Sequence, residues 1–356
     1  MIRRLLSGDL PRNRLLAALL VAIVVGLALA PFIAPGARGI NVAAKILVFV
    51  LLVASYDLLL GYTGIVSFAH TMFFGIGAYG VAIASTRMGP GWAAIGLGTL
   101  VALLASALLA LVIGLFSLRV RAIFYAMITL AVATAFQTLA SQLSDFTGGE
   151  DGLSFKVPEV LSPGFSLADA PFLGASLDGR LVTYYLLFVV VSVLFLALLR
   201  LVNSPFGRVL QAIRENDFRA ESIGFPVVWY RTASNVIAAA VATVAGALLA
   251  IWLRYNGPDT SLSFEIMLDV LLIVVIGGMG TMYGAVIGST LFLLAQTYLQ
   301  DLMKVVAEAG AALPVVPALF SPDRWLLWLG VLFVLSVYHF PSGIVGRLRT
   351  RARLGA

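Results

Sequence analysis

The sequence has no cysteine and only two histidines, His70 and His339, among its 356 residues. The absence of cysteine excludes disulfides, thiolate metal ligands and cysteine nucleophiles. Two histidines so far apart argue against a multi-histidine metal site, and hence against a zinc enzyme. The phosphate-binding pattern G-x-x-x-x-G-K-[ST] is also missing from the sequence, so we expect no ATP site of that kind in this chain. A membrane enzyme would need a convergent catalytic set, and we find no candidate for one.

Charge is scarce as well: 11% of the residues are charged, against 61% that are hydrophobic. A soluble domain usually carries about 25% charged residues. The apolar runs are long enough to cross roughly 30 Å of hydrocarbon at about 20 residues each. The sequence therefore predicts an all-α, polytopic helical bundle with about ten transmembrane helices and the lipid membrane as its surroundings. The ten candidate spans are residues 15–34, 41–60, 62–86, 91–117, 122–142, 181–202, 232–253, 264–280, 283–302 and 325–341.

Arginines at both ends of the chain predict two cytoplasmic termini, because loops rich in Lys and Arg stay on the cytoplasmic side. Ten spans satisfy the even number that this arrangement requires. The count places the acidic linker 143–180 outside the cytoplasm and the arginine-containing loop 203–231 inside it. The N-terminal apolar run is longer than a signal-peptide core of about 7–15 residues, so we expect it to be retained as a span. Residues 1–356 then form a single transmembrane domain, and the net charge of +6 gives no reason to expect a nucleic-acid partner.

Small residues recur at every fourth position in three segments. In lipid this spacing lets helix backbones approach closely, because packing replaces the hydrophobic drive that water would supply. A second interpretation is that clustered glycines break helices beside a translocation path, since unwound backbone at membrane depth must face protein or water. Both interpretations apply to GYTGIVSFAHTMFFGIGAYG, residues 61–80, and to GGMGTMYGAVIG, residues 277–288. The three series are Ser67, Thr71 and Gly75; Ser234, Ala238, Ala242, Gly246 and Ala250; and Gly280, Gly284 and Gly288.

The ionisable residues in or near the expected spans include Asp57, His70, Glu265 and Asp269, and such groups usually face the bundle interior or a water-filled cavity. Asp57 ends near the cytoplasmic edge of the second span, so a capping role is favoured over substrate contact. His70 either bonds a neighbouring helix or contacts a ligand. Glu265 and Asp269 are four apart and share a helix face, which predicts a wet face on the eighth span. The three acids also leave open an ion-coupled secondary transporter, which would work without ATP.

The loop 203–231 predicts two short helices. Ser204 followed by Pro205 is a good helix start, and Gly224 with Pro226 ends the second helical stretch. Apolar residues alternate with charged ones, as in an amphipathic helix. The loop is either a solvated connector or a docking helix for a cytoplasmic partner, since we expect no soluble domain of this chain to cover its apolar side.

Three segments, matching in order and spacing, resemble the permease subunits of bacterial ABC importers of the branched-chain amino-acid type. The resemblance covers roughly residues 40–345. One departure is Phe68-Ala69, where the family more often has Leu-Gly before the histidine. Importers of urea and short amides use permeases of very similar pattern, so they remain an alternative for the cargo. The segments are SPFGRVLQAIRENDFRAESIGF (204–225), GYTGIVSFAHTMFFGIGAYG (61–80) and VVIGGMGTMYGAVIGS (274–289).

The resemblance implies a multi-pass subunit of the bacterial inner membrane that imports branched-chain amino acids and performs no catalysis. Its implied partners are a homologous second permease, two cytoplasmic ATPase subunits and a periplasmic binding protein. This chain would hold no cofactor, because ATP-Mg would be bound by the ATPases. The residues implied in coupling to the ATPase are Ser204, Gly207, Arg208, Ile213, Arg214, Glu215, Asn216, Glu221 and Gly224. The residues implied in a translocation path are Tyr62, Thr63, Ser67, His70, Gly75, Gly77, Gly278 and Gly280.

Overall fold

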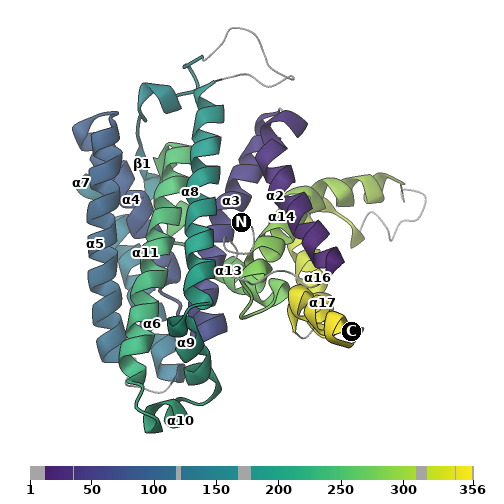
Figure 1. Cartoon of the computed structure of the whole chain (residues 1–356). Coiled ribbons are helices and arrows are strands. Elements are labelled where there is room, and N and C mark those ends of the chain that lie inside the picture. The colour runs from purple at the N-terminus through teal and green to yellow at the C-terminus, as the bar shows by residue number, and fades with distance from the viewer. Residues whose placement is uncertain are drawn as a thin grey trace.

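The computed structural model describes residues 13–34, 36–117, 122–166, 178–309, 319–340 and 342–354, and most of these residues are helical (Figure 1). Short connections make successive long helices run in alternating directions, so they form an antiparallel bundle. The long helices are α2 (Arg14–Ile33), α3 (Ala37–Asp57), α4 (His70–Met88), α5 (Trp92–Ser117), α6 (Ala122–Gln142), α8 (Gly179–Val202), α11 (Val227–Leu253), α13 (Phe264–Gly277), α14 (Met282–Ala309) and α16 (Trp325–His339).

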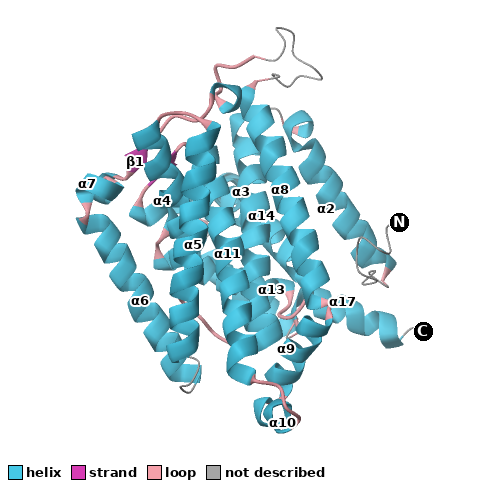
Figure 2. Cartoon of the chain, turned by 60° about the vertical axis from the view of Figure 1, so that its left-hand side comes forward, coloured by secondary structure: helices cyan, strands magenta, loops and turns pink. Residues whose placement is uncertain are grey.

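The short elements gather at the two ends of the bundle (Figure 2). One end carries α7 (Ser144–Thr147), η2 (Gly149–Asp151), β1 (Leu153–Ser154), η3 (Glu159–Leu161), β2 (Tyr255–Asn256) and α12 (Pro258–Ser261). The opposite end carries α9 (Pro205–Glu215) and α10 (Asp217–Ser222). Three further elements are the π-helix η1 (Leu58–Thr63), η4 (Pro322–Arg324) and α17 (Gly343–Leu354). Strands β1 and β2 pair antiparallel, with Leu153 opposite Asn256.

Nine helices within the described part of the chain are long and apolar enough to cross a membrane. The tenth expected span is α4, which has 19 residues and a length of roughly 28 Å at about 1.5 Å per residue. Its glycines, hydroxyls and histidine lower its hydropathy, yet most of its residues are buried inside the bundle. The expected multi-pass helical bundle is therefore confirmed, with α4 as an inner helix.

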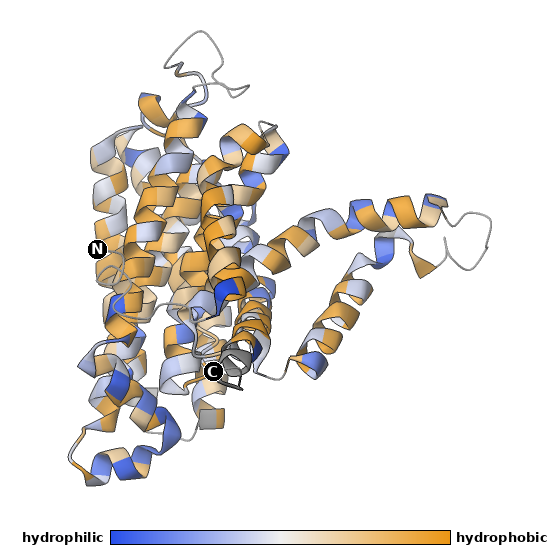
Figure 3. Ribbon diagram, turned by 45° about the vertical axis from the view of Figure 1, so that its right-hand side comes forward, coloured by the Kyte–Doolittle hydropathy of each residue, from blue (hydrophilic) through white to orange (hydrophobic). Residues whose placement is uncertain are grey.

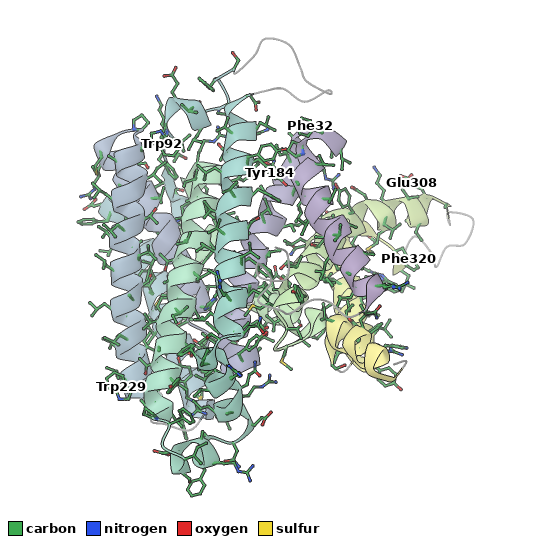
Figure 4. All side chains as sticks on the ribbon, in the orientation of Figure 1. Phe32, Trp92, Tyr184, Trp229, Glu308 and Phe320 are labelled. Atoms are coloured by element: carbon green, nitrogen blue, oxygen red, sulfur yellow. The ribbon has the colours of Figure 1, made fainter. Side chains whose placement is uncertain are left out.

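The long helices are built largely of hydrophobic residues (Figure 3). On α2 and α5, large hydrophobic residues such as Val21 and Leu104 are more than half exposed. Exposed tryptophans mark both ends of the bundle, with Trp92 at the start of α5 and Trp229 at the start of α11 (Figure 4). Tryptophan at both ends with an apolar surface between is typical of a membrane-spanning protein. The second half of α14 and α16 extend away from the bundle (Figure 3).

The core is built on α3 and α11, which contact α4, α5, α8, α13 and α14. Close helix crossings explain the small residues. A Cβ on Gly77 of α4 would strike the Thr243 backbone of α11, and one on Gly246 of α11 would strike the Phe74 carbonyl of α4. The packing interpretation is thus confirmed for this pair of helices.

The described part of the acidic linker, residues 143–166, folds onto the end of the bundle. Phe155, Val157 and Leu161 are buried against α4 and α11, next to Ala78 and Ile251. This part of the linker is therefore packed on the bundle, because its apolar residues cover the helix ends. Residues 167–177 of the linker lie outside the described residues.

Both described ends of the chain lie together at the α9 end. The Asn13 side chain donates a hydrogen bond of 3.0 Å to the carbonyl of Leu348 in α17. Gly343, which begins α17, packs closely on Gly278 at the turn between α13 and α14. The described ends, at residues 13 and 354, are therefore on the same side of the bundle as α9, as the even number of spans predicts.

Candidate functional site

The expected span 62–86 is broken. The α3 helix continues through η1, a π-helix with a wider turn that is common at functional sites. Gly64 ends it with a φ of 75°, a left-handed conformation that glycine adopts without strain. Residues 64–69 are then non-helical, and α4 begins at His70. The break in the early glycine segment is therefore confirmed, and its place beside a translocation path stays a prediction.

Side chains satisfy backbone donors in this break. The N–H of Phe68 donates to the hydroxyl of Thr129 on α6 at 3.1 Å, and the N–H of Ala69 donates to Ser67 at 3.4 Å. Thr63 donates to the Leu58 carbonyl at 2.8 Å and to the Ser234 hydroxyl at 3.3 Å. Unwound backbone is stable at membrane depth only with such partners.

The later glycine segment forms the turn between α13 and α14. Gly278 and Gly280 both have positive φ, and α14 begins two residues after Gly280. The N–H of Gly280 donates to Oδ1 of Asp57 at 2.9 Å. Asp57 is 2% exposed. Its role is therefore to cap a backbone group of another segment, which supports the expected capping role over substrate contact.

Arg214 on α9 joins both glycine segments. Its Nη1 donates a hydrogen bond to the carbonyl of Gly61 in η1. The same Nη1 lies 2.9 Å from where a Cβ on Gly280 would stand, and the Arg214 Cγ lies 3.0 Å from where one on Gly64 would stand. We call Asp57, Gly61, Arg214 and Gly280 the glycine node. The three sequence segments that carry the family resemblance meet there.

A polar pocket of about 530 Å³ lies beside the glycine node. It includes two expected path residues, Tyr62 and Gly280, and two expected coupling residues, Arg214 and Glu215. The remaining lining residues are Gly61, Asn203 and Gln211. The pocket thus places polar groups between α9 and η1, the segment just before the break that separates α3 from α4.

The two short helices begin and end as the sequence predicts. The Ser204 hydroxyl accepts from the Gly207 N–H at 3.5 Å, and the Asn216 side chain caps α10 by accepting from the Arg219 N–H at 2.8 Å. Gly224 follows α10 with a φ of 98°. Gly207 is buried because α9 folds back closely on the Val202 carbonyl.

The apolar side of α9 is not free, which corrects the sequence-based expectation. Leu210 and Ile213 are 0% and 1% exposed. Ile213 packs with Ala220 of α10 and Val227 of α11. The apolar face therefore seats α9 on its own chain, because the start of α11 supplies the surface that the sequence analysis did not foresee. Ile213 holds α9 in place and cannot reach a partner.

The exposed surface around α9 and α10 mixes charged and apolar residues. Phe218, Ile223 and Trp229 are 78%, 68% and 63% exposed, and the sequence analysis missed all three. Their signal in the sequence is that large apolar residues stand between charged ones in a loop. Of the expected coupling residues, the exposed ones are Arg208, Arg214, Glu215, Asn216, Glu221 and Gly224.

His70 belongs to a buried polar cluster. Its Nε2 lies 2.8 Å from the Ser55 hydroxyl, which donates its own proton to the Leu52 carbonyl at 2.7 Å. Nε2 must therefore carry the hydrogen and donate it to Ser55. The Tyr56 ring lies 5.2 Å from the imidazole, centroid to centroid. The bond to α3 matches the expectation of a partner on a neighbouring helix.

The expected path residues are mostly packed inside the bundle. Those that are buried are Tyr62, Thr63, Ser67, His70, Gly75, Gly77 and Gly278, whereas Gly280 is partly exposed. Gly75 packs against Leu262, and Gly77 against Thr243. Their part in a path stays a prediction, because only Tyr62 and Gly280 line the pocket at the node.

Glu265 and Asp269 line a second pocket of about 470 Å³ together with Lys45, and apolar residues line much of the rest. This agrees with the expected wet face of α13. The sequence analysis missed Lys45, which stands alone among apolar residues of α3. Within the described residues, no group of three or more His, Cys, Asp or Glu side chains is placed to hold a metal ion.

Apolar outer surfaces, a helix broken within the bundle and a surface helix tied to that break define a multi-pass membrane transport protein. Comparison with known families makes the class specific. Residues 39–337 match the family described as the permease component of branched-chain amino acid transport systems. The match covers most of the sequence, so the chain belongs to this family. It is accordingly a transport subunit and not an enzyme.

Two relatives align over nearly the whole chain, and both are named High-affinity branched-chain amino acid transport system permease protein LivM. The relative from Salmonella typhimurium is 26% identical over 364 residues, covering 98% of this chain and 79% of the relative. The relative from Escherichia coli K12 is 27% identical over 350 residues, covering 94% and 76%. No solved structure gives a significant match.

Proposed function

We propose that this chain is the transmembrane permease of an ATP-driven importer for leucine, isoleucine and valine. The observation that carries the proposal is the Arg214 bond from α9 to the Gly61 carbonyl of the broken helix. The family and the two relatives support the cargo class, since both relatives are named for branched-chain amino acid transport.

The exposed surface of α9 and α10 would dock on a cytoplasmic ATPase. Phe218 and Ile223 would fill apolar contacts, and Arg208, Glu215 and Glu221 would form polar contacts at the rim. A shift of α9 would reach η1 and the α13–α14 turn through Arg214. ATP-driven closure of the ATPases would then switch the bundle between inward-open and outward-open states.

The complete machine would contain a homologous second permease, two ATPase subunits and a periplasmic binding protein. The family description of a permease component within a transport system supports further components in general. The ATPases would bind ATP-Mg, and this chain would hold no cofactor. It would lie in the bacterial inner membrane with α9 and both termini in the cytoplasm.

Two alternatives make different predictions. A urea or short-amide permease would use the same machine with another cargo. An ion-coupled secondary transporter would not need ATP. The family match favours the importer, and the Oδ1 of Asp57 has a structural partner in the Gly280 N–H.

The test is uptake of labelled leucine and of labelled urea into proteoliposomes that contain this chain with its co-encoded permease, ATPases and binding protein. We expect leucine uptake that requires ATP on the α9 side. Urea uptake without leucine uptake would change the cargo and keep the machine. Leucine uptake that persists without ATP and depends on an ion gradient would contradict the importer.

A further inference from the structure

The second pocket lies among α3, α4, α11, α12, α13 and α14. Helix α11 runs away from the α9 end and stops at Leu253, where residues of the pocket begin, and α12 follows directly. The pocket is therefore at the end of the bundle opposite α9. On the proposed orientation, this end faces the periplasm.

Four charged side chains line this pocket, Lys45, Asp259, Glu265 and Asp269. A single amide joins two of them that are opposite in charge, Lys45 and Asp269. Lys45 Nζ donates to Oε1 of Gln296 at 3.2 Å, and Nε2 of Gln296 donates to Oδ2 of Asp269 at 3.2 Å. An ammonium only donates and a carboxylate only accepts, so the chemistry of the two neighbours fixes the orientation of the amide. No ion pair within 4.0 Å joins Lys45 to Asp269 in the described part of the chain.

A free α-amino acid presents the same pattern as the Gln296 amide. Its carboxylate accepts hydrogen bonds, its ammonium donates them, and the two groups are neighbours on one carbon. A lysine and an aspartate held apart by one amide are therefore spaced to hold a zwitterion.

We propose that this pocket is an entry site for a zwitterionic amino acid and that Gln296 occupies it in the empty state. Lys45 binds the carboxylate of the substrate, and Asp269 binds its ammonium. Gln296 turns aside when the substrate enters. The assignment rests on the proposed function and adds to it the residues that receive the cargo.

The inner wall of the pocket suits an aliphatic side chain. Phe49, Phe74, Leu249 and Trp252 line it and are each less than 10% exposed. Lys45 stands over the Phe49 ring, with Nζ 5.5 Å from the centroid. The charged groups at the rim would bind the ammonium and carboxylate of a branched-chain amino acid, and the apolar wall would contact its aliphatic side chain.

The pocket also discriminates between the two cargo classes. Urea carries no charge, so it has no group to balance Lys45 or Asp269. Placing a charged side chain such as Lys45 or Asp269 in an apolar surrounding costs free energy unless the charge has a partner. The pocket thus favours an amino acid over urea.

The first test uses the absence of native cysteine from the chain. Asn41→Cys places one thiol at the rim of the pocket, and Ser154→Cys places one at the same end outside it. In the assembled importer, maleimide labels the thiol in the absence and presence of L-leucine. At about twice its dissociation constant, leucine should slow labelling at Asn41→Cys by about threefold, because only the empty fraction reacts.

The controls for this labelling test are chemical. Leucinamide lacks the carboxylate and 4-methylpentanoate lacks the ammonium, so neither should protect the Asn41→Cys thiol. Labelling at Ser154→Cys should not respond to leucine. Equal protection by all three compounds, or none by leucine, would overturn the proposal.

The second test measures leucine uptake by Lys45→Gln and Asp269→Asn importers. Loss of a charge-assisted contact should lower uptake by about tenfold or more, while ATP hydrolysis stimulated by the binding protein remains. The matched controls Lys304→Gln and Asp145→Asn alter exposed groups outside the pocket and should transport normally. Gln296→Ala should lower uptake less than either charge substitution, because the amide leaves when substrate binds.

The outcomes separate this proposal from the proposed function. If Lys45→Gln and Asp269→Asn importers still take up leucine normally, the pocket assignment fails and the importer stands. If Gln296→Ala is as damaging as Lys45→Gln, the three side chains form a structural bridge and the assignment also fails. If the unaltered importer takes up no leucine, the proposed function itself fails.

Discussion

At the scale of single residues, the glycine node depends on polar groups that find partners far along the chain. Arg214 and Gly61 are 153 positions apart, and Asp57 and Gly280 are 223 apart. Each bond joins a side chain to a backbone group that the neighbouring helix leaves unpaired. Such groups are costly when they lose their partners in a buried place.

Replacing Asp57 by leucine should destabilise the chain. The Gly280 N–H would lose its acceptor and Arg214 would lose the neighbouring negative charge, at a cost of about 1–3 kcal/mol. Thermal unfolding of the purified chain in detergent measures the change. Asp145→Leu, at an exposed position, is the control and should change stability by no more than about 0.5 kcal/mol. Equal stability of the two variants would show that Asp57 does not hold the α13–α14 turn.

At the scale of elements, the close packing of α4 against α11, α5 and Leu262 leaves no room for side chains at its glycines. Bulky residues at Gly75, Gly77 or Gly80 would strike Leu262, the Thr243 backbone or Gly98 and Ala102. Loss of transport in such variants would therefore report packing whether or not these glycines line a path. A test of the path needs residues that face a pocket, such as Tyr62.

The Gly77→Val substitution should weaken the bundle more than Gly96→Val. The added side chain at 77 meets the α11 backbone, whereas a Cβ at 96 in α5 meets nothing within 4 Å. Overpacking costs about 1–3 kcal/mol, and both variants share the small helix cost of a β-branched residue. The yield and unfolding temperature of the two purified chains measure the difference. A Gly77→Val chain as stable as Gly96→Val would contradict the close crossing.

Substitutions in α9 and α10 can distinguish residues needed for folding from residues needed for docking. The Phe218→Ser/Ile223→Ser double variant removes two exposed apolar residues, so it should keep the unfolding temperature and lose ATPase association. Ile213→Ala removes a buried residue and should lower stability by about 2–5 kcal/mol. Co-purification of the ATPase with each variant, beside its unfolding temperature, tests both statements. Normal ATPase retention by the double variant would place the docking surface elsewhere.

At the scale of the whole molecule, the local patterns of the sequence predict the elements, and long-range contacts decide the sites. The apolar runs predict the bundle, and Ser204 with Pro205 predicts the start of α9. The inward position of the α9 apolar face could not be predicted, because it depends on how α11 leaves the membrane. Lys45 lies inside the expected span 41–60, where an ionisable residue is itself a signal that the sequence analysis missed. Its partner could not be predicted, because Gln296 is 251 positions away and only the fold brings the two together.

The orientation of the chain in the membrane is testable because the chain has no native cysteine. Ser222→Cys on α10 and Ser154→Cys on β1 are exposed at opposite ends. In intact cells, a membrane-impermeant maleimide should label Ser154→Cys, and should label Ser222→Cys only after lysis. The reverse pattern would contradict cytoplasmic placement of α9 and of both termini.

The most direct test of the account is the amount of leucine transported per ATP hydrolysed by an importer that carries Arg214→Gln. The comparison is Arg200→Gln, which alters an exposed arginine near the end of α8 and leaves the glycine node intact. We predict that Arg214→Gln retains assembly and ATP hydrolysis but transports about tenfold less leucine per ATP, since the contact between α9 and the Gly61 carbonyl is lost. Arg200→Gln should transport the normal amount. An unchanged ratio in Arg214→Gln would contradict the role of the glycine node in linking ATP hydrolysis to transport.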